Sequence, residues 1–170
     1  MRRPALRALV VGLLVLPALL PAPSARAQEP IAVIVSREWV GIDRLALSTL
    51  RRLYLGRIAR VAGRRVQRFH LQSGSPAREA FSQSVLGRSE AALREYWLEQ
   101  ALTGGVLPPG EFASPAAMMQ YVRAHPGAIG YVPHGALGDP AALEGLRVLG
   151  VSTGTRALLP SDPAYPIRQR

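Results

Sequence analysis

Short apolar runs alternate along this chain with segments in which apolar residues recur at helical spacing. Residues 31–35 form a continuous, mostly β-branched apolar run, which predicts a strand buried on both faces. Residues 66–71 alternate in side-chain character and predict a second strand, near an edge of the sheet. Two further apolar runs, at 128–132 and 146–151, predict two more strands. The pattern therefore indicates a sheet with at least one fully covered central strand.

Helices are predicted between these strands. Leucines at helical spacing predict a helix over residues 47–54. Three more helices are expected to begin after Ser75, Ser89 and Ser114, because a serine can cap the first N–H groups of a helix. Because strands and helices alternate, the sequence predicts an α/β domain over residues 28–153 with a mainly parallel sheet.

The first 27 residues have the organisation of an export signal. Three arginines among the first seven residues precede an apolar stretch at 8–20, and Ala25 and Ala27 give the small-x-small pattern of a cleavage site. Prolines interrupt the apolar stretch, and a membrane span needs about 20 apolar residues. We therefore expect a cleavable signal peptide over residues 1–27, a periplasmic mature chain and no membrane span after cleavage; an uncleaved anchor is the alternative.

Charge and cysteine content limit the classes of ligand and the sources of stability that the fold can have. The net charge is +10, and removal of the leader with its four arginines leaves +6. Nucleic-acid binding would need a clustered basic face with stacking aromatic residues, whereas the arginines are scattered along the chain, which argues against it. There is no cysteine, so the fold depends on its apolar core. Residues 154–170 are basic and rich in proline, which predicts a flexible basic tail.

The candidate chemistry lies at a predicted loop that opens a helix. Unpaired N–H groups at a helix N-terminus form a ready site for an anion. The loop follows the predicted strand at 66–71, while Ser36 follows the strand at 31–35. Carboxyl ends of parallel strands share one edge of a sheet, so we expect these segments to meet. The predicted ligand-binding residues are Ser36, Ser73, Gly74, Ser75, Ala77 and Arg78.

Each of these residues also has a purely structural interpretation. Ser75 can cap its own helix, Ser36 can belong to a turn, and Arg78 can be a surface cation. Gly130, inside a predicted strand, indicates a close approach of its backbone to a packed helix or to a ligand. The three histidines lack metal-ligand spacing, and no G-x-S-x-G pattern occurs, so we predict no metal, no cofactor and no enzymatic activity.

Three stretches resemble the phosphate-type solute-binding proteins of ABC transporters, the PstS-like branch of the type II periplasmic-binding-protein fold. They are Leu50–Gly56, Ser75–Phe81 and Pro126–Val132, the last of which is similar to the family's TPGAIGYV sequence. The resemblance implies a periplasmic-binding-protein-like fold, a small oxyanion such as phosphate as ligand, and an inner-membrane ABC permease as partner. It covers nearly all of residues 31–151.

The chain departs from the family pattern where the ligand would bind. The family reads SGTREAF; here Ser75 and Arg78 match, while Pro76 replaces the glycine and Ala77 replaces the threonine. The proline removes one N–H donor and the alanine removes one hydroxyl. We also expect a member shortened at its N-terminus, with a shallow anion cradle. Two functions stay open: oxyanion binding for a transporter, and a periplasmic interaction or sensor module that has lost its ligand.

Overall fold

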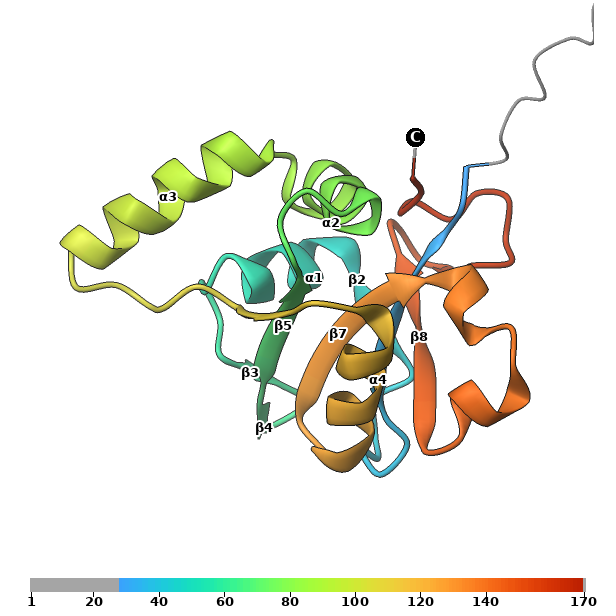
Figure 1. The fold of residues 1–170 in the computed structure, drawn as a ribbon. Helices are drawn as coiled ribbons and strands as arrows, with labels where there is room; N and C mark the ends of the chain where they lie inside the picture. Colours follow the sequence, from blue (N-terminus) through green and yellow to red (C-terminus); the bar gives the residue numbers. More distant parts are fainter. Residues whose placement is uncertain (1–27, 170) are drawn as a thin grey trace, which may run out of the picture.

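A computed structural model describes residues 28–169, which form a mixed sheet with helices on both faces (Figure 1). The sheet has the order β2-β8-β1-β7-β5-β6, with β9 paired to β8. Five strands (β2, β5, β6, β7 and β8) run in one direction, while β1 is antiparallel to β7 and β8. The predicted α/β class with a mainly parallel sheet is confirmed. The strands are β1 (Ile31–Ser36), β2 (Arg44–Ala46), β5 (Gln67–Leu71), β6 (Gly110–Phe112), β7 (Ala128–Pro133), β8 (Leu146–Ser152) and β9 (Ala157–Leu158).

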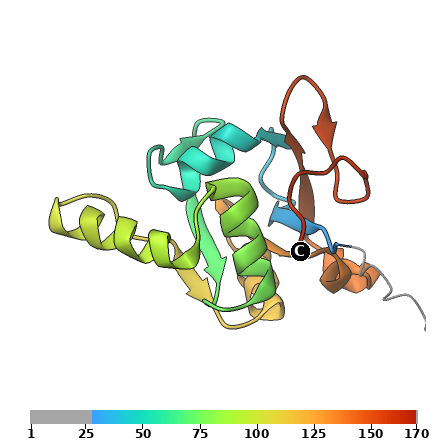
Figure 2. The same ribbon diagram turned by 90° about the horizontal axis from the view of Figure 1, so that it is seen from above.

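The helices cover the two faces of the sheet unequally (Figures 1 and 2). Successive residues of β7 point to opposite faces, and Gly130 lies against Met118 of one helix while Tyr131 stacks on Phe81 of another, with ring centroids 3.9 Å apart. Helix α4 therefore covers one face, and α2, with α1 beside it, covers the other. Helix α3 projects away from the sheet. The helices are α1 (Leu47–Tyr54), α2 (Pro76–Phe81), α3 (Glu90–Leu102) and α4 (Pro115–Ala124).

The predicted helix starts are confirmed in atomic detail. Ser75, Ser89 and Ser114 each accept a hydrogen bond from the N–H group three residues later, at 3.2–3.3 Å. The helix predicted to begin after Ser75 continues to Leu86 but changes its geometry, because α2 is followed by a π-helical turn at Ser82–Leu86. Three capped helices thus begin where their serines predicted.

The sequence correctly predicted both central strands of the core, β1 and β7. The apolar residues of β1 are fully buried, as predicted for a strand covered on both faces. Gly130 in β7 allows α4 to pack closely, because a Cβ there would lie 2.5 Å from Sδ of Met118. The close approach predicted at Gly130 is therefore a helix contact.

The expectation about the sheet edge is confirmed, and the expectation about the C-terminus is wrong. Strand β5 lies near an edge of the sheet, as its second strand, with β6 paired outside it. The predicted flexible tail is packed: Leu158 pairs with β8, Tyr165 and Ile167 are buried, and Ile167 O accepts a hydrogen bond from Ile31 N at 2.9 Å. A few apolar residues suffice to anchor this segment beside β1, despite its prolines and charges.

The remaining elements are short. A separate two-stranded sheet pairs β3 (Arg60–Val61) with β4 (Arg64–Arg65), and 3₁₀ turns occupy His134–Leu137 and Pro140–Leu143. The predicted signal peptide at residues 1–27 lies outside the described residues. Across residues 28–169, no helix has the length and apolar character needed to traverse a bilayer.

Candidate functional site

The carboxyl ends of the five parallel strands meet at one edge of the sheet, but Ser36 is not there. Because β1 runs against its neighbours, its last residue lies at the opposite edge, paired with Leu146 at the start of β8. Ser36 is fully buried, and its hydroxyl donates to Arg123 O at 3.2 Å. The expectation that Ser36 shares an edge with the loop before α2 is therefore wrong. A fully buried apolar run does not reveal the direction of its strand, and the sequence argument assumed a parallel one.

The loop before α2, residues 72–75, lies where its turn-forming residues predicted it. Gly74 adopts a positive φ of 81°, which suits a glycine, and Ser75 N donates back to Gln72 O at 3.3 Å. The Ser75 hydroxyl oxygen accepts a hydrogen bond from Arg78 N, so its lone pair serves the helix while its own proton stays available to donate. Ala77 is the second helical residue, where a backbone N–H has no partner within its own helix.

A cavity of about 260 Å³ opens beside this loop, between the N-termini of α2 and α4. Each of these helices begins with a Ser-Pro pair, at Ser75-Pro76 and Ser114-Pro115. Helix N-termini carry partial positive charge, and two of them here face one space. None of the residues that line the cavity is acidic. The lining residues are Leu71, Ser75, Pro76, Ala77, Ala113, Pro115, Pro133 and Gln169.

Arg78 does not point into this cavity. Its side chain is nearly buried, with Nε donating to Glu90 Oε1 at 3.1 Å and Nη1 donating both to Leu71 O at 2.8 Å and to Glu111 Oε1 at 3.1 Å. The same Glu90 oxygen accepts a hydrogen bond from Ser82 at 2.5 Å. The predicted ligand cation is thus the centre of an internal network, and its charge is balanced by two carboxylates of the chain itself.

A cleft of about 230 Å³ lies on the other side of Arg78, and His70 and Ser73 line it. Burial, followed by the charges of Arg78 and Arg68, holds the pKa of His70 well below its usual value, so the imidazole is neutral. Burial also raises the pKa of Tyr131, whose hydroxyl lies 2.9 Å from His70 Nδ1. Tyr131 therefore keeps its proton, and one hydrogen bond joins its hydroxyl to Nδ1, in a direction that the imidazole tautomer sets. The other ring nitrogen of His70 is Nε2. That atom is buried and has no partner among the described residues.

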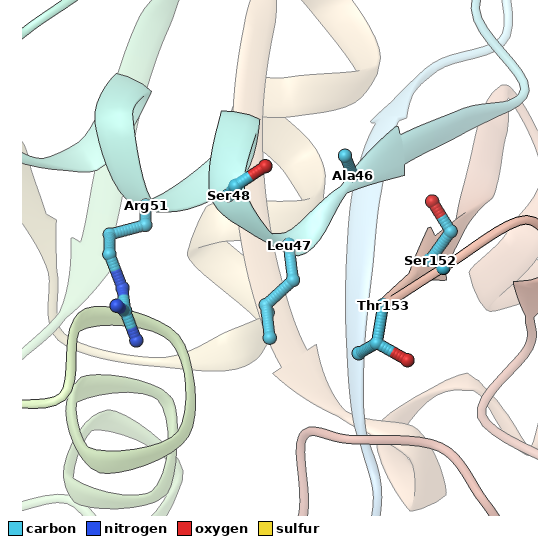
Figure 3. A pocket seen from close by; sticks show the side chains of 7 residues that line it. Ala46, Leu47, Ser48, Arg51, Ser152 and Thr153 are labelled. Atoms are coloured by element: carbon cyan, nitrogen blue, oxygen red, sulfur yellow. The ribbon is translucent and has the colours of Figure 1, made fainter.

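A third hollow, of about 420 Å³, lies at the N-terminus of α1 (Figure 3). Ser48, Ser152 and Thr153 contribute hydroxyl groups to it, and Arg51 Nε donates to Val85 O at 2.6 Å, which holds the guanidinium against the π-helical turn. The sequence reasoning missed this hollow. A Ser-Thr-Gly sequence at 152–154, directly after the strand predicted at 146–151, could have indicated it. These residues lie at the boundary of the predicted flexible tail, so no site was expected there.

Chemically, the edge offers hydrogen-bond donors and positive dipoles rather than reactive groups. Within residues 28–169, no three His, Cys, Asp or Glu side chains come together as a group that could hold a metal ion. Of the six predicted ligand residues, the structure brings Ser75 and Ala77 to the cavity between α2 and α4. Ser73 and Arg78 lie at the neighbouring cleft. Gly74 lies in the loop between them, and Ser36 is at the far edge.

No protein-family model matches the chain, and no curated protein matches it in sequence. Solved structures do match. A substrate-binding protein of Clostridium perfringens assigned to phosphate ABC transport, solved with bound phosphate, gives a TM-score of 0.57 and 17% identity over 75% of this chain and 46% of that one. An ABC-type phosphate transport receptor of Vibrio cholerae gives a TM-score of 0.56 and 15% identity, and the match covers 75% of this chain and 48% of that one. PstS of Borrelia burgdorferi gives a TM-score of 0.61 and 16% identity, and the match covers 83% of this chain and 55% of that one.

These identities are low, and the chain spans about half the length of the structures that it matches. The matched proteins are phosphate-binding transport proteins, as the resemblance in the sequence predicted. The part of the chain that these structures match, 75–83% of its length, therefore has the periplasmic-binding-protein-like fold of these proteins, over about half of their length.

Proposed function

We propose that this chain binds a small oxyanion of the phosphate type in the cavity between α2 and α4, as an exported solute-binding protein that serves an ABC permease. The observation that carries the proposal is the convergence of two helix N-termini on one cavity without an acidic lining residue. The matched phosphate-binding proteins support the same ligand class. Binding involves hydrogen bonds and dipoles only, with no covalent chemistry.

The proposed contacts come from the backbone and from uncharged side chains. Ser75 donates its hydroxyl proton, Ala77 donates its N–H, and the loop at Gly74 lets the chain turn close to the anion. The side-chain amide of Gln169 adds a donor from the C-terminal segment, which lines the same cavity. Hydrogen bonds to a charged group contribute about 1.5–3 kcal/mol each, so three such donors suffice for micromolar to millimolar affinity.

Titration calorimetry with inorganic phosphate tests the proposal, with the variant Ser75→Ala and the matched control Ser89→Ala. Both serines cap a helix through the same kind of hydrogen bond, at 3.3 and 3.2 Å, so both variants lose about 1 kcal/mol of stability. Only Ser75→Ala should also weaken phosphate binding, by about tenfold or more. Absence of heat with the unchanged chain up to millimolar phosphate, or equal weakening in both variants, would end the proposal.

A second function, a periplasmic interaction or sensor module, is favoured by one specific observation. Helix α3 projects from the body (Figures 1 and 2), and Leu98 and Leu102 on it are 63% and 79% exposed. The two leucines lie one helical turn apart and so form a small contiguous apolar patch, the kind of surface that a partner protein can cover. Pull-down from a periplasmic extract distinguishes the two functions: a stoichiometric partner retained without phosphate, and released by Leu98→Ser with Leu102→Ser, would favour the module.

A further inference from the structure

A short hairpin carries the densest positive charge among the described residues. Strands β3 and β4 are joined by the two-residue turn Ala62-Gly63, in which both residues have positive φ angles, 47° and 75°. This is the geometry of a type I′ turn, whose twist matches that of paired strands. We call residues 57–65 the basic hairpin; it presents the exposed side chains of Arg57, Arg60, Arg64 and Arg65.

The charge of the basic hairpin is not balanced by its surroundings in sequence or in space. Nine arginines and no acidic residue lie between Asp43 and Glu79. Among the ion pairs of the described residues, none involves an arginine of the basic hairpin; the guanidiniums of Arg60 and Arg64 donate only to the carbonyl oxygens of Gly63 and Pro126. The hairpin thus differs from Arg78, which the chain neutralises itself.

Two features of the hairpin cost stability. Arg60 and Arg65 are direct partners in the register of the strand pair, and like charges opposite one another repel. Ala62 occupies a left-handed conformation that residues with a Cβ adopt reluctantly. A repulsive pair of charges and a strained turn residue in one short hairpin, with no compensating contact inside the protein, are typical of a functional surface.

We propose that the basic hairpin docks the protein on an anionic phospholipid surface. The forked guanidinium matches phosphate oxygens, and a row of arginines on a hairpin fits an extended array of headgroups. No aromatic residue occurs between positions 57 and 66, so the stacking platform that single-stranded nucleic acid uses is absent from this stretch of sequence.

The position of the hairpin suits such docking. It directly precedes the amino end of β5, whereas the cavity between α2 and α4 lies at the carboxyl end of that strand (Figure 1). A chain docked through the hairpin holds its oxyanion cavity at the far end of the sheet, away from the lipid. The inference is independent of whether that cavity binds phosphate.

Vesicle co-sedimentation with the full mature chain tests the proposal. The probe is a vesicle of phosphatidylglycerol and phosphatidylcholine, compared with one of phosphatidylcholine alone. The test variant replaces Arg60, Arg64 and Arg65 by Gln, and the control replaces three exposed arginines elsewhere by Gln. The control arginines lie on β2, on α3 and beside β9, and they are Arg44, Arg94 and Arg156.

We expect the unchanged chain to sediment with the anionic vesicles only, and to be released at about 1 M salt, where the Debye length is about 3 Å. The hairpin variant should lose about a hundredfold in affinity, while the control, with the same net charge, loses less than about tenfold. Circular dichroism shows whether each variant remains folded. Equal losses in the two variants, no sedimentation with anionic vesicles, or tighter binding to single-stranded DNA than to these vesicles would overturn the proposal.

Discussion

Nε of Arg78 lies 3.1 Å from Oε1 of Glu90, and the two side chains are only 7% and 15% exposed. The second carboxylate on Arg78, that of Glu111, is half exposed at 50%. A nearly buried ion pair is expensive to break from one side, since the remaining charge loses a partner that water replaces only in part. The two carboxylates on one guanidinium are therefore unequal in energy.

We predict that Glu90→Ala lowers the free energy of unfolding by about 3–5 kcal/mol. Glu111→Ala removes an ion pair of similar length that water already screens, so its effect should stay below about 1 kcal/mol. Urea unfolding followed by circular dichroism measures both. Equal losses in the two variants would mean that burial does not decide the strength of this network.

The sequence was sufficient to predict the helices and the main strands. It did not predict the direction of β1 or the ion-pair partners of Arg78. Capping serines act within one helical turn, so Ser75, Ser89 and Ser114 could be assigned from local sequence alone. The partners Glu90 and Glu111 lie 12 and 33 residues from Arg78, and such long-range pairs leave no periodic trace in a single sequence.

The same distinction explains what the sequence did not predict about the strands. Strand β6 has three residues, too few to show an alternation, so the sequence did not predict it. Ser36 has the same neighbours in sequence whether β1 runs parallel or antiparallel, and only the pairing with β7 and β8 decides on which side of the molecule it emerges. Nothing in residues 31–35 encodes that pairing locally.

Gly130 provides a test of the packing between β7 and α4. A Cβ at this position would lie 2.5 Å from Sδ and 2.9 Å from Cγ of Met118, which is fully buried and has little room to move. Gly130→Ala should destabilise the fold by about 1–3 kcal/mol through overpacking. Gly154→Ala is the control, because no atom lies within 4 Å of the added Cβ. Thermal unfolding of the pair measures the difference, and a neutral Gly130→Ala would contradict the predicted contact.

His70 should make the stability of the fold depend on pH. Burial lowers its folded-state pKa well below the unfolded value of about 6.5. Above that pH the imidazole is neutral in both states. Below it the unfolded chain takes up the proton first, so stability falls as the pH decreases, by up to about 1.4 kcal/mol per pH unit until the folded-state pKa is reached.

Measuring the free energy of unfolding between about pH 7 and pH 5, above the carboxylate range, isolates this contribution. His70→Gln should flatten the slope, whatever its effect on the absolute stability. An identical slope in the unchanged chain and in His70→Gln would show that the histidine already finds a way to be charged in the folded state.

The two departures from the SGT pattern predict a gain of function. Pro76→Gly restores a backbone N–H at the start of α2, and Ala77→Thr places a hydroxyl on a residue that lines the cavity between α2 and α4. Each restored hydrogen bond to a charged ligand is worth about 1.5–3 kcal/mol, so the double variant should bind phosphate at least a hundredfold more tightly. The glycine costs about 0.4–1 kcal/mol of stability by loosening the unfolded chain. Pro140→Gly, at the start of a 3₁₀ turn elsewhere, has the same entropic cost and should leave phosphate affinity unchanged. Calorimetry on the three proteins decides the matter, because a double variant that binds no better than Pro140→Gly would remove the first turn of α2 from the binding site.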